Sequence, residues 1–130
     1  MKRILILSVL LMAVVFTGCG QKAVTVDNKV IGPRDQPSIE KSIILAARSL
    51  GWQVQPVDDQ TMEATIHSND ATLTVLITYT SNSYVIQHEK SVGLDFNPTD
   101  NSIKKQYARW VEDLDDRIQD ELERAERNAK

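Results

Sequence analysis

Two histidines are the side chains of this sequence best suited to bind a metal ion or to act as a general base. Asp70 lies three residues after His67, and Glu89 directly follows His88. A zinc site needs three or four such ligands at about 2 Å from the metal, and two scattered histidines supply too few. We interpret both as polar residues at strand ends, with a small metal-binding domain centred on His67 and His88 as the alternative.

A hydrolytic site at the same histidines is the second form of that alternative. It would need a nucleophile, a base within hydrogen-bonding distance and an oxyanion hole. Ser68 adjoins His67, but the sequence contains no Gly-x-Ser-x-Gly motif and no glycine-rich phosphate loop. The acid pairs Asp58-Asp59 and Asp115-Asp116 fit a turn and a solvated helix face. We therefore expect no catalytic residue, no cofactor and no bound metal.

The only cysteine, Cys19, ends an apolar N-terminal segment. Met1-Lys2-Arg3 is a short basic start, and residues 4–16 are apolar except for Ser8. This order is typical of a secretory signal peptide, and the apolar run is shorter than the roughly 20 residues of a membrane-spanning helix. We expect a signal peptide over residues 1–18 and no intramolecular disulfide in the exported chain.

Phe16-Thr17-Gly18-Cys19 resembles the lipobox of bacterial lipoproteins, with Phe16 where leucine is usual. The resemblance implies that Cys19 receives a diacylglyceryl thioether, that the signal peptide is cut before it, and that the new amine is acylated, for example with palmitate. Two or three acyl chains hold a protein on a membrane almost permanently. Gly20 in place of aspartate implies the outer membrane, facing the periplasm, in a Gram-negative host. An ordinary signal peptide with an unmodified cysteine is the alternative.

Charge argues against a nucleic-acid-binding function. The sequence has 130 residues and a net charge of −3, and the 112 residues from Cys19 onward hold all 18 acids but 13 of the 15 bases, giving −5. An acidic domain is a poor binder of nucleic-acid phosphates. The remaining length suits one compact domain without a large buried active-site cavity.

Turn residues and apolar spacing divide the mature chain into segments. Residues 19–36 contain Gly32-Pro33 and show neither a helical nor a strand period. We therefore expect this segment to comprise the lipidated cysteine and a flexible tether, with an edge strand over residues 23–26 as the alternative. From residue 37 a single domain is expected, beginning with a helix of about 12 residues that Ser38 caps and Gly51 ends. A short strand over residues 52–57 follows.

Alternating apolar residues predict a sheet in the middle of the domain. Residues 62–67 and 72–80 alternate around a polar turn and predict a hairpin with one buried face, and residues 84–88 predict another strand. A helix from near Asn101 is predicted by one apolar stripe: Ile103, Tyr107, Trp110, Val111, Leu114, Ile118, Leu122 and Ala125. The expected fold is α+β, a two-layer sandwich of a three- or four-stranded antiparallel meander with both helices on one face.

Threonines dominate the sheet face that such helices would leave uncovered. Thr65, Thr72, Thr74 and Thr78 share it with Leu76. A solvated β face is the simplest interpretation, and a surface or free edge that accepts a partner protein is the alternative. The aromatic residues Trp52, Tyr79, Tyr107 and Trp110 are expected in the core, with the lining of a ligand groove as the alternative.

The order and spacing of these motifs resemble a family of small bacterial lipoproteins of uncharacterised function, from Ser38 to Leu122. The resemblance rests on Gly51-Trp52, His67 followed by Ala71-x-Leu73-x-Val75-x-Ile77-x-Tyr79, Tyr84-Val85-Ile86, Ser91 followed by Leu94, and Tyr107-x-x-Trp110 with Leu114 and Ile118. Ala108 and His88 depart from the family's usual asparagine and tyrosine. The resemblance implies no activity. We expect a lipid-anchored envelope protein, an accessory of an envelope assembly, whose domain binds a partner rather than catalyses a reaction.

Overall fold

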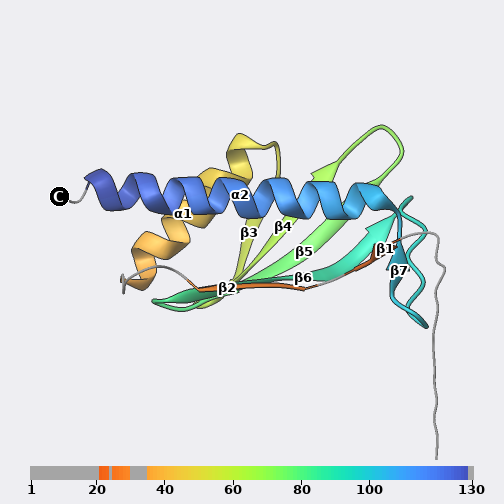
Figure 1. Ribbon diagram of the computed structural model, residues 1–130, viewed down its shortest axis with the longest axis horizontal. Helices are drawn as coiled ribbons and strands as arrows, with labels where there is room; N and C mark the ends of the chain where they lie inside the picture. The colour runs from red at the N-terminus through yellow and green to blue at the C-terminus, as the bar shows by residue number, and fades with distance from the viewer. Residues whose placement is uncertain (1–20, 24, 30–34, 129–130) are drawn as a thin grey trace, which may run out of the picture.

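A curved antiparallel sheet carries two helices on one of its faces in the computed structural model, which describes residues 21–23, 25–29 and 35–128 (Figure 1). The elements are, in chain order, β1 (Gln21–Lys22), β2 (Val26–Lys29), α1 (Gln36–Ser49), β3 (Gln53–Asp58), β4 (Thr61–His67), β5 (Thr72–Tyr79), β6 (Ser83–Val92), β7 (Ser102–Ile103) and α2 (Lys105–Asn128). The expected α+β fold, with an antiparallel sheet and an N-terminal and a C-terminal helix, is confirmed.

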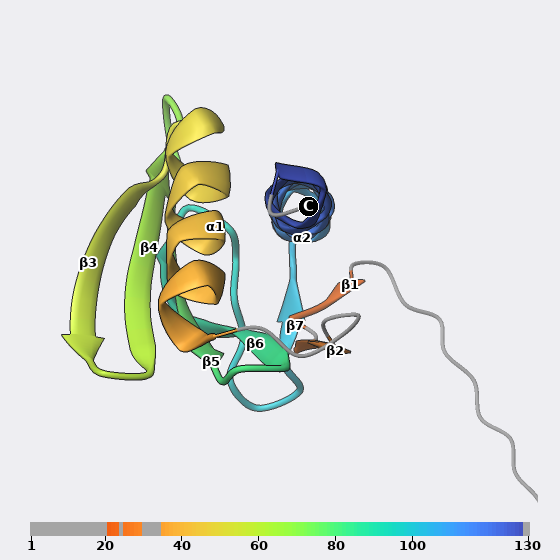
Figure 2. The same cartoon turned by 90° about the vertical axis from the view of Figure 1, so that its left-hand side faces the viewer.

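The five-stranded sheet has the order β2-β6-β5-β4-β3, with every neighbouring pair antiparallel. Strands β3 to β6 form the expected meander, and β2 adds a fifth strand at the edge beside β6. Because β2 and β3 lie at opposite edges, α1 carries the chain across the sheet between them. Figure 2 shows α1 and α2 side by side within the curve of the sheet.

The core lies between the sheet and the helices, as the alternation of the strands requires. Its sheet side includes Met62, Ala64, Leu73, Val75, Ile77, Tyr79, Tyr84 and Ile86, and its helix side includes Ile39, Ile43, Ala46, Ala47, Tyr107, Val111, Leu114, Ile118 and Leu122. Trp52, Tyr79 and Tyr107 are buried there, and Trp110 packs half-buried against its margin. These four aromatic residues therefore contribute to the core.

Two tyrosines join the sheet to the helices by hydrogen bonds as well as by packing. Tyr79 on β5 donates to Glu40 Oε1 of α1 over 2.6 Å. Tyr84 on β6 donates to Asp115 Oδ1 of α2 over 2.5 Å and accepts a bond of 2.7 Å from the amide of Gln119. A buried phenol needs such a partner, so these bonds set where each helix sits above the sheet.

The structure differs from the expected tether over residues 19–36 wherever it describes that segment. Val26–Lys29 is strand β2, Gln21–Lys22 pairs with Ser102–Ile103, and Ala23 is buried. The edge strand foreseen over residues 23–26 thus lies slightly later, as β2. Pairing partners that are distant in sequence explain the difference, because the local sequence shows no strand period.

The ends of the helices also differ from the expected ones. Asp35, rather than Ser38, is the N-cap of α1, and the hydroxyl of Ser38 donates to Asp35 Oδ1 over 2.8 Å. Helix α2 begins at Lys105, four residues after Asn101, because Ser102–Ile103 forms strand β7 with β1. The buried side chain of Ile103 therefore belongs to a strand and not to the apolar stripe of the helix.

Both glycines in the part of the chain that the structure describes have positive φ, but only one of the two is enclosed. A Cβ at Gly93 (φ 80°) would lie 2.1 Å from the carbonyl oxygen of Asp70, whereas a Cβ at Gly51 (φ 92°) would meet nothing within 4 Å. Gly93 thus lets the chain after β6 pass directly against the turn between β4 and β5.

Gly93→Ala is therefore expected to destabilise the fold more than Gly51→Ala. The positive φ should cost each variant about 1–2 kcal/mol, and the clash with Asp70 should cost Gly93→Ala about 1–3 kcal/mol more. Urea unfolding of the two variants measures the difference directly. Equal losses would show that the Asp70 turn moves aside without cost.

Candidate functional site

The open face of the sheet, opposite the helices, is the largest surface on which the sequence places candidate site residues. Strand register puts Thr65 opposite Thr74, and Thr72, Leu76 and Thr78 alternate along β5 with the buried core residues. The structure therefore brings together on one face all five residues of the predicted partner surface.

Thr74 does not meet the expectation of an exposed partner residue. It is only 3% exposed, because its register neighbours Thr65 on β4 and Lys90 on β6 flank it. Its hydroxyl lies 2.9 Å from that of Thr65, so the two form a cross-strand hydrogen bond. Thr74 is a structural member of this face, whereas Leu76 and Thr78 are partly exposed.

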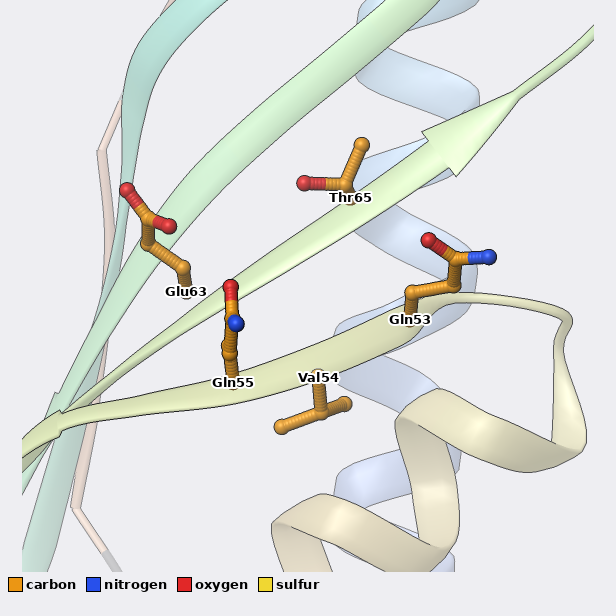
Figure 3. A pocket seen from close by; sticks show the side chains of 5 residues that line it. All are labelled: Gln53, Val54, Gln55, Glu63 and Thr65. Atoms are coloured by element: carbon orange, nitrogen blue, oxygen red, sulfur yellow. The ribbon is translucent and has the colours of Figure 1, made fainter.

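A polar hollow of about 250 Å³ lies on the same face beside Thr65, over β3 and β4. Figure 3 shows Gln53, Gln55, Glu63 and Thr65 standing on the open side of the two strands, while Val54 points the other way. Amide, carboxylate and hydroxyl groups together can donate to and accept from a peptide backbone. The sequence analysis did not identify Gln53, Gln55 and Glu63. Strand alternation could have done so, because Gln53 and Gln55 flank the inward Val54 and Glu63 lies two residues before Thr65 on the same strand.

A β-bulge brings a second carboxylate onto the open face. Register shifts where Thr74 pairs with Lys90 and Val75 pairs with His88, so Glu89 is the extra residue of β6. Partial burial, a hydrogen bond to Glu63 and repulsion by its charge raise the pKa of Glu89, and Lys90 partly offsets this. The nearby charge of Glu63 therefore favours the protonated form of Glu89.

The two histidines lie on opposite faces of the sheet. His67, at the end of β4, is exposed on the open face, and its Nδ1 lies 3.0 Å from the hydroxyl of Thr72. His88 faces the helices, where it stacks on Phe96 at 4.1 Å between ring centroids and approaches Tyr107 at 5.8 Å. The structure therefore does not bring His67 and His88 into one site.

The surroundings of His88 are those of a packed residue. Burial lowers its pKa, so the ring favours the neutral form, and its Nε2 lies 3.0 Å from the hydroxyl of Ser91. Burial also raises the pKa of the neighbouring Tyr107 phenol to about 12. Among residues 21–23, 25–29 and 35–128, no three His, Cys, Asp or Glu side chains are placed to hold a metal ion.

The free edge of the sheet at β3 is a poorer docking place than the open face. Pro56 lies in this strand and lacks the backbone N–H that an added strand would need. Hydrogen-bonding side chains on the open face carry no such restriction. The face, rather than the edge, is therefore the better candidate for contact with a partner.

No family model matches this sequence, and no match to a curated protein is found. Within the part of the chain that the structure describes, neither helix is both long and apolar enough to cross a membrane.

Glu89→Gln is expected to raise stability at pH 7, by less than about 1 kcal/mol because the group is largely exposed. The pKa of Glu89 is higher in the folded protein than in the unfolded chain. Protonated Glu89 therefore contributes its full stabilisation below the unfolded pKa, and this contribution is lost as pH rises through the folded pKa. The gain should therefore disappear near pH 4, where wild type is also protonated. Thermal unfolding of wild type, Glu89→Gln and Glu63→Gln at pH 4 and pH 7 tests this. A gain of equal size at both pH values would contradict the raised pKa of Glu89.

Proposed function

We propose that this protein is a bacterial envelope lipoprotein, anchored through lipid on Cys19, whose domain binds a partner protein and performs no chemistry of its own. The anchoring proposal is supported by the basic start, the apolar segment and the lipobox-like residues 16–19. It implies a location on the periplasmic side of a membrane, the outer membrane in a Gram-negative host.

The observation that carries the binding proposal is the one-sided covering of the sheet. Both helices lie on the same face (Figure 2), so the opposite face of β3, β4, β5 and β6 is left to solvent. That face offers Leu76, Thr65 and Thr78 beside the polar hollow of Gln53, Gln55 and Glu63. Leu76 is partly exposed among hydrogen-bonding groups, which supports a small protein interface with an apolar centre and a polar rim.

Cys19→Ser is expected to abolish lipidation and to leave the precursor uncleaved. Labelled palmitate in growing cells, followed by detergent phase partitioning, should place wild type in the detergent phase and the variant outside it. Ser68→Ala, a change on an exposed turn, is the control and should partition like wild type. Palmitate on the Cys19→Ser chain, or none on wild type, would refute the anchor.

Leu76→Lys is expected to remove partner binding with little loss of stability, because the side chain lies on the open face. A photoreactive residue introduced at Thr78 should crosslink one defined protein in intact cells, and Leu76→Lys should reduce that crosslink at least about tenfold if Leu76 is a central contact. Leu45→Lys is the matched control, since Leu45 is 47% exposed on α1 in the other layer. Equal crosslinking in both variants would exclude the open face as the interface.

A further inference from the structure

The chain enters the domain within two residues of the proposed lipid site. Strand β1 begins at Gln21, and two extended residues span at most about 7 Å. Lys22 pairs with Ser102 of β7. The N–H of Ala23 donates to the carbonyl of Asn101 over 2.9 Å, and the Asn101 amide donates back to the carbonyl of Ala23 over 3.1 Å. Any anchor on Cys19 is therefore attached almost directly to the folded domain.

This point of entry lies at one end of an elongated molecule. Figure 1 shows β1 and β7 at the end where α2 begins, and the last turn of α2 at the opposite end. With 24 residues, α2 extends for about 36 Å. A membrane that holds Cys19 thus faces the β1–β7 end, and the far end of α2 is remote from the entry point.

Charge differs between these two ends. The entry end carries four exposed basic residues, Lys22, Lys104, Lys105 and Arg109, which we call the basic end. Acids also lie at this end. Asp95 lies 3.8 Å from Lys104, and Asp100 accepts the N–H of Ser102 at its Oδ1 over 3.0 Å and Lys22 Nζ at its carbonyl over 2.9 Å, whereas Lys105 and Arg109 are exposed on α2. Between residues 112 and 128, by contrast, α2 has eight acids and three bases.

The bases at the start of α2 are placed against the helix's own electrostatic preference. A helix N-terminus favours acidic side chains, yet the first turn of α2 contains no acid and begins with Lys105. Arg109, one turn later, extends the same exposed surface. Cations that lower helix stability at this position fit an anionic partner outside the protein.

We propose that the basic end binds the anionic headgroups of the membrane to which Cys19 is anchored, so that the domain rests on the bilayer with the acidic part of α2 directed away from it. This orientation rests on the lipid anchor proposed above. Basic residues close to the lipid attract anionic headgroups, and the acidic part of α2 would be repelled. The same arrangement keeps the domain from swinging freely about its anchor.

Energy transfer from each end of the full lipidated chain to the membrane tests the orientation. Donor dyes are placed separately through Thr99→Cys, in the exposed turn of the entry end, and Glu126→Cys, near the end of α2. Vesicles of phosphatidylcholine with phosphatidylglycerol carry an acceptor on their headgroups. Transfer is expected to be strong from position 99 and weak from position 126, and equal transfer from both would overturn the proposal.

Charge variants identify the contact. Lys105→Glu combined with Arg109→Glu should lower the ratio of docked to undocked protein by about 25-fold, on the basis of about fivefold for each basic residue. The matched pair Arg124→Glu and Arg127→Glu, at the far end, should leave it unchanged. The headgroup contact would be overturned if the ratio of docked to undocked protein changed neither in the Lys105→Glu, Arg109→Glu variant nor on removal of phosphatidylglycerol.

The failure of this proposal and that of the anchor are distinguishable. Flotation of the purified chain with the vesicles, and its mass, report the lipid independently of orientation. A chain without lipid that does not float overturns the anchor and with it the docking. A lipidated chain that floats but shows equal transfer from positions 99 and 126 overturns the docking alone.

Discussion

The rest of the structure depends on the path of α1, which must carry the chain from one edge of the sheet to the other. Strand β2 lies beside β6 and strand β3 at the opposite edge, so the connecting helix has to cross a face. Helix α2 buries its apolar stripe beside α1, on the same face (Figure 2). The bonds of Tyr79 to Glu40 and of Tyr84 to Asp115 then tie each helix to the sheet. The face that α1 crosses is thus the core face, and α2 completes its cover.

The residues of the open face are suited to contact with water. A face that remains in water must satisfy its own polar groups, and Thr65 and Thr74 do so by bonding across the strands. The bulge at Glu89 places a second carboxylate beside Glu63, and the two negative charges repel each other. Bulges tend to mark places where a strand redirects a side chain. The polar hollow and the partly exposed Leu76 therefore lie on the open face, outside the core.

Local patterns predicted the elements whose burial follows from their own sequence. Alternation through Met62, Ala64 and Leu73 identified the hairpin, and the spacing of Leu114 and Ile118 identified α2, because each pattern directs one face to the core. Strands β1 and β7 escaped prediction, and β2 was foreseen only as the alternative to a tether, because these strands exist through pairings distant in sequence, such as Lys22 with Ser102. Glu63 and Glu89 escaped as a pair for a related reason: their proximity depends on register and a bulge, which no local period encodes.

The short connection to Cys19 changes what kind of partner the proposed anchor favours. A flexible tether of 17 residues would let the domain sample roughly 20–25 Å, enough to reach partners at different heights. With β1 starting at Gln21, a lipidated domain gives up that reach and gains a restricted orientation. When the domain and its partner are both held at the membrane, their positions and orientations are restricted before they meet, so less entropy is lost on binding. A freely diffusing partner would still lose its own translational and rotational entropy. If the anchor is present, the geometry therefore favours a membrane-associated envelope protein as the partner of the open face.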